Sequence, residues 1–287
     1  MHYKPLYNVG KEDIVGGKIM GQSLLDIERS IITRYRRKIW RNFVRATREF
    51  DLIREGDRIA VAISGGKDSL LMAKLLQELQ RHGKDNFQLE FIAMDPGYDE
   101  NTKEILVTNS EYLGIPINIF TTNIFQVAEK IGKGNPCYMC AKMRRGALYG
   151  KAEELGCNKL ALGHHFNDVI ETIMLNLLYT GNFSTMLPKI ESQNFENLKL
   201  IRPLYYIEEI TIIDFFQYIG LSPLNCACTI TGNKVESKRS EMKKLIKDLG
   251  KDIKDVDKII FRASKNVNMN GILGWRKDGE RYSYLDK

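Results

Sequence analysis

Short apolar runs alternate with helix-like segments through the central part of the chain. Four apolar runs have the length expected of buried strands: 58–63, 89–94, 116–120 and 159–163. Helices are predicted between or after them: 70–80, 102–113 and 169–179. Alternating strands and helices favour a parallel sheet with right-handed crossovers and helices on both faces. The predicted fold class is therefore α/β, with a doubly wound parallel sheet.

An amphipathic helix is predicted before this region, from about residue 23 to residue 50. Its apolar positions recur at three- and four-residue steps: Ile32, Tyr35, Ile39, Phe43, Ala46 and Phe50. Cations recur in the same way on another face: Arg34, Lys38, Arg41, Arg45 and Arg48. Such a stripe can follow a phosphate backbone, although most charge runs are solvated helix faces.

These patterns divide the chain into three parts. Residues 1–50 form an N-terminal arm followed by the basic helix, and residues 51–205 form the α/β domain. Residues 206–287 form a C-terminal helical region, with helices predicted at 207–219 and 234–249. The second of these helices is also basic: Lys234, Lys238, Arg239, Lys243 and Lys244. Beyond residue 250 the periodic signal is weak.

Composition and charge narrow the class of protein. The chain has 287 residues, of which 43% are hydrophobic and 28% charged, so it can bury a sizeable core. No apolar run approaches the ~20 residues that span a bilayer, and the N-terminus lacks a signal-peptide stretch. We therefore expect a soluble cytoplasmic protein without a membrane partner. The formal net charge of +7 suits a polyanion such as nucleic acid.

The five cysteines indicate a metal site or redox chemistry. Their odd number, in a chain without an export signal, argues against a disulfide framework. Four of them form two close pairs, Cys137 with Cys140 and Cys226 with Cys228. If the first pair opens a helix, its two sulfurs lie on one face. The spacing of Cys137 and Cys140 is also found in redox pairs, zinc knuckles and unrelated buried thiols. Cys157 precedes a predicted strand and is expected to be structural.

A glycine-rich loop lies between the first predicted strand and its helix. It reads Ser64-Gly65-Gly66-Lys67-Asp68-Ser69. The two glycines let the backbone approach a ligand and adopt positive φ, while the helix N-terminus offers free N–H groups. Lys67 adds a full charge, and the serines can donate hydrogen bonds. The loop predicts a phosphate site that is not of the Walker A type; the alternative is a turn with a capping serine.

Two further segments carry candidate site residues. The run Gly163-His-His-Phe-Asn-Asp168 ends a predicted strand and precedes a helix, which Asp168 can cap. Arg144 and Arg145 follow Cys140 by one helical turn. They can hold phosphate or RNA, or they can form a solvated helix face.

These motifs together resemble a known family. The run SGGKDS at 64–69 is similar to the PP-loop of the N-type ATP pyrophosphatases, which have the adenine nucleotide α-hydrolase-like fold. The run PCYMCAKMRRGALY at 136–149 resembles a segment of the tRNA 2-thiocytidine synthetases within that superfamily. The similarity covers about residues 25–250, and further matching segments are EGDRI at 55–59, GHHFND at 163–168, 185–188 and IRPL at 201–204.

The resemblance implies a nucleotide site for ATP and Mg²⁺. The loop from Ser64 to Ser69 would hold the pyrophosphate end of ATP, with Mg²⁺ balancing the charge. Ligands of such folds lie at the carboxyl ends of the strands, which places four more residues near the nucleotide: Ala62, Ile63, Met94 and Asp95. Gly163 and Asp168 belong to a G-H-H-x-x-D motif and would lie beside ATP or its Mg²⁺. Three cations would stabilise charge as pyrophosphate leaves: Lys67, Arg144 and Arg145.

The resemblance also implies a 4Fe–4S cluster that three cysteines bind and that leaves one iron open. Cys137 and Cys140 match the first two ligands. At the third ligand the family has C-x-x-C, whereas this chain reads Cys226-Ala-Cys228. A gap-free register through Gly232 places Cys228 on the ligand position, and Cys226 is the second choice.

The implied reaction is ATP-dependent thiolation of a tRNA base. ATP adenylates the C2 oxygen of a pyrimidine, by implication an anticodon-loop cytidine, and sulfide on the open iron displaces AMP to give 2-thiocytidine. The sulfur donor would be a cysteine desulfurase or free sulfide, and related enzymes are commonly homodimers. Three alternatives remain: a tRNA 2-thiouridine synthetase, a cluster-free PP-loop ligase acting on tRNA or a small molecule, and an RNA-binding sulfur carrier or redox sensor.

Overall fold

The computed structural model describes residues 22–125, 127, 136–192, 194–224 and 238–286. The chain divides into two compact units, Met1–Phe166 with Leu187–Val235 and Asn167–Met186 with Glu236–Lys287. The three-part division expected from the sequence stays a prediction.

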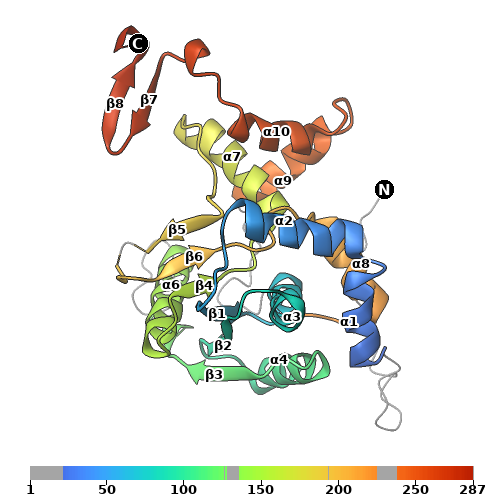
Figure 1. Ribbon diagram of the computed structural model, residues 1–287. Coiled ribbons are helices and arrows are strands. Elements are labelled where there is room, and N and C mark those ends of the chain that lie inside the picture. Colours follow the sequence, from blue (N-terminus) through green and yellow to red (C-terminus); the bar gives the residue numbers. More distant parts are fainter. Residues whose placement is uncertain (1–21, 126, 128–135, 193, 225–237, 287) are drawn as a thin grey trace. The chain divides into compact units, whose positions relative to one another are not determined.

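The first unit is built on a six-stranded sheet in the order β3-β2-β1-β4-β6-β5 (Figure 1). Its strands are β1 (Arg58–Ile63), β2 (Gln88–Asp95), β3 (Ile117–Thr121), β4 (Lys159–Ala161), β5 (Lys189–Glu191) and β6 (Lys199–Ile201). Every pairing is parallel except that of β5 with β6. The doubly wound parallel sheet and its four expected strands are confirmed. The antiparallel edge was not predicted, because three-residue strands leave almost no periodic signal.

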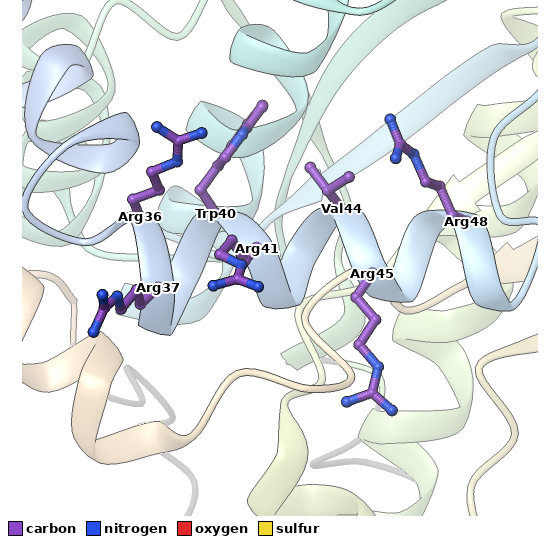
Figure 2. Close-up of a pocket in the computed structure, with 7 residues that line it drawn as sticks. All are labelled: Arg36, Arg37, Trp40, Arg41, Val44, Arg45 and Arg48. Atoms are coloured by element: carbon purple, nitrogen blue, oxygen red, sulfur yellow. The ribbon is translucent and has the colours of Figure 1, made fainter.

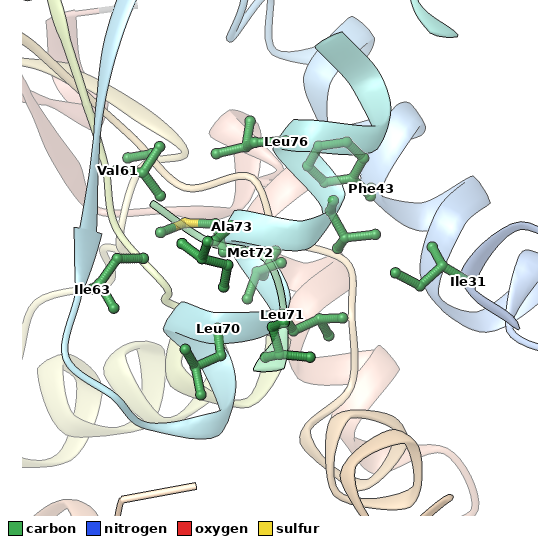
Figure 3. Close-up of a cluster of buried hydrophobic side chains, with 14 of the residues drawn as sticks. Ile31, Phe43, Val61, Ile63, Leu70, Leu71, Met72, Ala73 and Leu76 are labelled. Carbon is green, nitrogen blue, oxygen red and sulfur yellow. The ribbon is translucent and has the colours of Figure 1, made fainter. Parts of the chain in front are cut away.

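Helices cover both faces of this sheet. They are α1 (Leu24–Ile32), the π-helical segment η1 (Arg36–Trp40), α2 (Arg41–Glu49), α3 (Lys67–His82), α4 (Glu100–Tyr112), α6 (Pro136–Glu154) and α8 (Glu209–Ile219). Side chains of β1 alternate between two cores. Val61 and Ile63 pack with Leu70 of α3, as Figure 3 shows, whereas Ala60 packs with Ala152 of α6.

The predicted helix at 23–50 is divided in the structure, where a turn at 33–35 separates α1 from η1 and α2. Five buried residues are spaced by four positions: Ile27, Ile31, Tyr35, Ile39 and Phe43. Residues at this spacing drift by about 40° per step around an α-helix, which has 3.6 residues per turn. The wider turn of η1, where the Trp40 N–H donates to the Tyr35 carbonyl at 3.4 Å, offsets this drift. The apolar row therefore keeps facing the core.

The second unit contains helices and one hairpin. Its elements are most of α7 (Phe166–Thr180), α9 (Lys238–Leu249), α10 (Val256–Lys265), η3 (Met269–Gly271), β7 (Gly274–Lys277), β8 (Glu280–Ser283) and η4 (Tyr284–Asp286). Tyr179 of α7 donates a hydrogen bond to Glu241 of α9. The rings of Trp275 and Tyr282 stack across the hairpin with centroids 5.4 Å apart. The hairpin was not predicted from the sequence.

Among the described residues, none of the helices combines the length and apolar character that a membrane span requires.

A buried ion pair fastens α1 to α3. Lys74 is fully buried, and its ammonium lies 2.6 Å from the Glu28 carboxylate and 2.9 Å from the Gln77 side-chain oxygen. Arg81 also contacts Glu28, at 2.8 Å. Although burial raises the pKa of Glu28, the two cations outweigh it and hold that pKa below its ordinary value. The junction therefore depends on a charged Glu28.

We expect Glu28→Gln to destabilise the protein by about 3 kcal/mol, because it leaves the Lys74 ammonium buried without its carboxylate. Adding Lys74→Met removes that charge and should recover most of the loss. Since the folded-state pKa of Glu28 is lowered, its contribution is present above the ordinary pKa of 4.5 and is lost as the pH falls through the folded value. Chemical denaturation of the single and double variants measures these effects. A double variant no more stable than Glu28→Gln would contradict this account.

Candidate functional site

The glycine-rich loop joins β1 to α3 at the carboxyl edge of the sheet. Gly65 has a φ of +77°, a left-handed conformation that favours glycine, and Gly66 immediately precedes α3. Ser69 stiffens the loop from within. Its hydroxyl accepts from the Ser64 N–H at 3.1 Å and donates to the Gly66 carbonyl at 2.9 Å. The N–H groups at the start of α3 make the loop suitable for an anion, and phosphate binding here stays a prediction.

Two other segments of the chain are in close contact with this loop. A Cβ on Gly163, which follows β4, would lie 3.1 Å from the Ser69 nitrogen. A Cβ on Gly65 would lie 2.6 Å from the Leu224 Cδ1 atom. The Leu224 N–H also donates to the Gly65 carbonyl at 2.9 Å. Gly163 therefore lies against the loop, and its proximity to ATP stays a prediction. The contact of Leu224 with the loop gave no sequence signal.

Carboxylates hold the Lys67 side chain in place. Its ammonium lies 3.0 Å from Asp68 and 3.2 Å from Glu209, which begins α8. The imidazole of His165 lies 3.8 Å from Asp68 and 4.0 Å from Glu209. Burial lowers the pKa of Lys67, but the two carboxylates outweigh burial and raise that pKa above its ordinary value. Lys67 is therefore a charged ammonium group, which could exchange its carboxylate partners for a phosphate.

Sequence reasoning missed the contact between Glu209 and Lys67. The two residues are far apart in the chain, and α8 gave only a helical pattern. The pairing depends on the position of α8 beside α3, which no local signal encodes.

The expected strand ends lie side by side. Ala62 pairs with Ile92, and Ile63 pairs with Ala93, so β1 and β2 end at the same edge. Met94 is among the last residues of β2. This places the loop after β1 next to the end of β2.

The Asp95 side chain forms hydrogen bonds with the backbone of the turn that follows β2. Its carboxylate accepts from the N–H groups of Gly97 at 2.8 Å and Tyr98 at 2.7 Å, and it pairs with Lys103 at 3.3 Å. Burial raises the pKa of Asp95, but these contacts outweigh burial and lower it. Asp95 thus fixes the turn, and its proximity to ATP stays a prediction.

The first cysteine pair opens α6, which is the arrangement that places two sulfurs on one helix face. Cys137 lies in the first turn, and its side chain is outside the described part of the structure. Cys140 is buried and packs with Met94, Ile124 and Phe125. Because Met94 lies at the end of β2, Cys140 and the glycine-rich loop share one edge of the sheet.

The chemistry of Cys140 fits a cluster ligand. It lies close to the N-terminus of α6, whose partial positive charge favours a thiolate. Its apolar surroundings are those in which iron–sulfur clusters are commonly shielded from solvent. Cys226 and Cys228 lie outside the described residues, so the choice of third ligand stays a prediction. In the part of the chain that the structure describes, no three His, Cys, Asp or Glu side chains are grouped to hold a metal ion.

Cys157 has a different environment. It is buried beside Ala60 and Leu160 in the core under α6. Burial raises the pKa of its thiol to about 11, so it is neutral at ordinary pH. This agrees with the structural role expected from the sequence.

The remaining predicted residues lie on two helices. On α6, Arg144 is half-buried, and Arg145 is exposed and lines a groove with Tyr149 and Phe195. Asp168 belongs to the second unit, where the Arg239 guanidinium lies 2.6 Å from its carboxylate. The roles of Arg144, Arg145 and Asp168 in the reaction stay predictions.

Known proteins share both the loop and the fold. Residues 33–222 match the family model of the PP-loop domain. The tRNA-cytidine(32) 2-sulfurtransferase of Pelobacter propionicus is 40% identical over 237 residues, which are 82% of this chain and 87% of that protein. The enzyme of the same name from Geobacter sulfurreducens is 38% identical over 231 residues, 80% of this chain and 89% of that protein.

One solved structure also resembles this chain. It is the U34-tRNA thiolase NcsA from Methanococcus maripaludis with its 4Fe–4S cluster. The TM-score is 0.62 at 25% identity, over 78% of this chain and 76% of that chain. With the matched PP-loop domain and the identity to relatives across most of their length, the chain belongs to the PP-loop family, in its branch of tRNA-cytidine(32) 2-sulfurtransferases.

Proposed function

We propose that this protein uses ATP to convert a cytidine of the tRNA anticodon loop, at position 32, to 2-thiocytidine. The observation that carries the proposal is the shared sheet edge, where the loop after β1 lies next to the strand that contacts Cys140. The names of the curated relatives support a cytidine target. A uridine target is the second candidate, since NcsA is named a U34-tRNA thiolase, but its identity to this chain is lower.

Activation of the base is the task of the PP-loop. An oxygen on C2 is a poor leaving group, so it first attacks the α-phosphorus of ATP, and the bond to pyrophosphate breaks. The N–H groups at the start of α3 would hold the departing pyrophosphate, while Ser69 keeps the loop in shape through its bonds to Ser64 and Gly66. The Lys67 charge, together with Mg²⁺, neutralises the charge that develops on it. Sulfur then replaces the activated oxygen, which departs with AMP.

Three cysteines supply the ligands for a cluster: Cys137, Cys140 and Cys228, with Cys226 as the second choice for the last. When bound, a 4Fe–4S cluster with one open iron supplies the sulfur atom for the exchange. The chain itself surrounds Cys140 with Ile124 and Phe125, which keep water from an activated base. The sulfur donor would be a cysteine desulfurase or free sulfide, and the enzyme would work as a homodimer.

The two buried cysteines allow a matched test of the cluster. Cys140 and Cys157 are both 7% exposed. We expect Cys140→Ser to lose iron, sulfide and tRNA thiolation while it keeps ATP binding, because only the cluster ligand is removed. Cys157→Ser should keep about four irons and four sulfides per chain, as one cluster requires. Metal and sulfide analysis with a visible spectrum, on protein purified without oxygen, measures this. Wild-type protein without iron after anaerobic reconstitution would rule out the cluster.

Two glycines with positive φ allow a matched test of the loop. Gly65 has a φ of +77° and Gly56 a φ of +80°, but only Gly65 is in contact with other side chains at its Cβ position. An alanine at either position costs roughly 1–2 kcal/mol of backbone strain. Gly65→Ala should in addition weaken ATP binding at least tenfold, because the new Cβ displaces Leu224 or the loop. Calorimetric titration with ATP checks this, and equal affinity in the two variants would contradict it.

A further inference from the structure

A shallow groove of about 710 Å³ follows η1 and α2, and arginines dominate its lining. The lining residues form two rows with four-residue spacing. One row is Arg36, Trp40, Val44 and Arg48, and the other is Arg37, Arg41 and Arg45. Figure 2 shows Arg36, Trp40 and Arg48 projecting to one side of the helix and Arg37 and Arg45 to the other. None of the described residues that line the groove is acidic.

The face of the helix that carries these arginines is fixed. The buried row on the opposite side, which includes Ile39 and Phe43, packs in the same core as Leu70 and Leu71 of α3. The helix cannot rotate to disperse its charges without exposing that row. The arginine rows are therefore held in place by the core of the α/β unit.

Most of the groove arginines have no carboxylate partner among the described residues. Arg45 lies 3.1 Å from Glu49, and its guanidinium stacks over the Tyr206 ring at 4.2 Å. The other four arginines form no ion pair with any described residue. Like charges three or four residues apart destabilise a helix, so this cluster does not contribute to the stability of the fold. An anionic ligand bound along this face would offset the repulsion.

We propose that this groove binds the phosphate backbone of the tRNA substrate, an inference that rests on the proposed function. The planar guanidinium binds phosphate through two parallel hydrogen bonds, which makes arginine suited to a polyphosphate chain. In the row Arg37, Arg41 and Arg45, successive arginines are about 6 Å apart along the helix axis, so several can meet one strand. The half-exposed Trp40 ring lies between the cations and can stack on an unpaired base.

The test removes three charges from the groove. The variant Arg37→Gln, Arg41→Gln, Arg48→Gln keeps side chains that favour helix, so its melting temperature should match that of the wild type. The control, Lys247→Gln, Lys254→Gln, Arg262→Gln, lowers the net charge equally at exposed positions outside the groove. Binding of a labelled tRNA transcript with cytidine at position 32 is followed by fluorescence anisotropy at several KCl concentrations.

We expect the groove variant to bind this tRNA at least tenfold more weakly at about 0.1 M KCl. The slope of log affinity against log salt should fall by about 2 to 3, since each lost phosphate contact removes about 1. Its KM for tRNA in thiolation should rise while kcat is kept, and the control should change affinity less than threefold. If both variants lost the same affinity for tRNA, or if neither lost any, the inference would be overturned. Thiolation by the wild type would still support the proposed function in either case. A wild-type protein that neither binds nor thiolates tRNA would overturn both.

Discussion

The close contact of three chain segments around Gly65 is the constraint on which the candidate site depends. Leu224 contacts the loop at Gly65, and the segment containing Gly163 contacts it at Asp68 and Ser69, so that a methyl group added to either glycine would displace its neighbours. The hydrogen bond from Leu224 to Gly65 closes this contact. Because α8 precedes Leu224, the same arrangement brings Glu209 to Lys67. The shape and charge of the loop thus depend in part on Glu209 and Leu224, which lie more than a hundred positions away in the chain.

One protein core lies beneath both of the proposed binding surfaces. At the sheet edge, a short loop that is braced by its own hydrogen bonds lies near a buried thiol, and together they would form a small site. Along η1 and α2, cations on a continuous helical path offer a long and shallow surface. Both border one core, in which Leu70 and Leu71 of α3 are buried together with Val61 of β1 and Phe43 of α2. A polyanion bound along the helix would therefore be bound to the same unit that carries the glycine-rich loop.

Local signals were sufficient for much of this fold. The four longer apolar runs became strands, and the loop between β1 and α3 could be recognised because its glycines, lysine and serines are adjacent in sequence. The helix opened by Cys137 could likewise be expected from spacing and similarity. By contrast, Glu209 and Leu224 act through tertiary contacts, and the short β5 and β6 depend on the sheet beside them. The π-helical turn was missed because a four-residue apolar repeat differs only slightly from the α-helical period.

The bond between Gly65 and Leu224 also has a consequence for the order in which the protein matures. During synthesis the phosphate loop leaves the ribosome about 160 residues before Leu224, a delay of roughly 10–30 s at ordinary rates of translation. Throughout that interval the loop lacks Leu224, and for most of it the loop also lacks the carboxylate of Glu209 that positions Lys67. Leu224 then emerges only a few residues ahead of Cys226 and Cys228. The contact that closes the glycine-rich loop and the last of these five cysteines thus become available at nearly the same moment of synthesis.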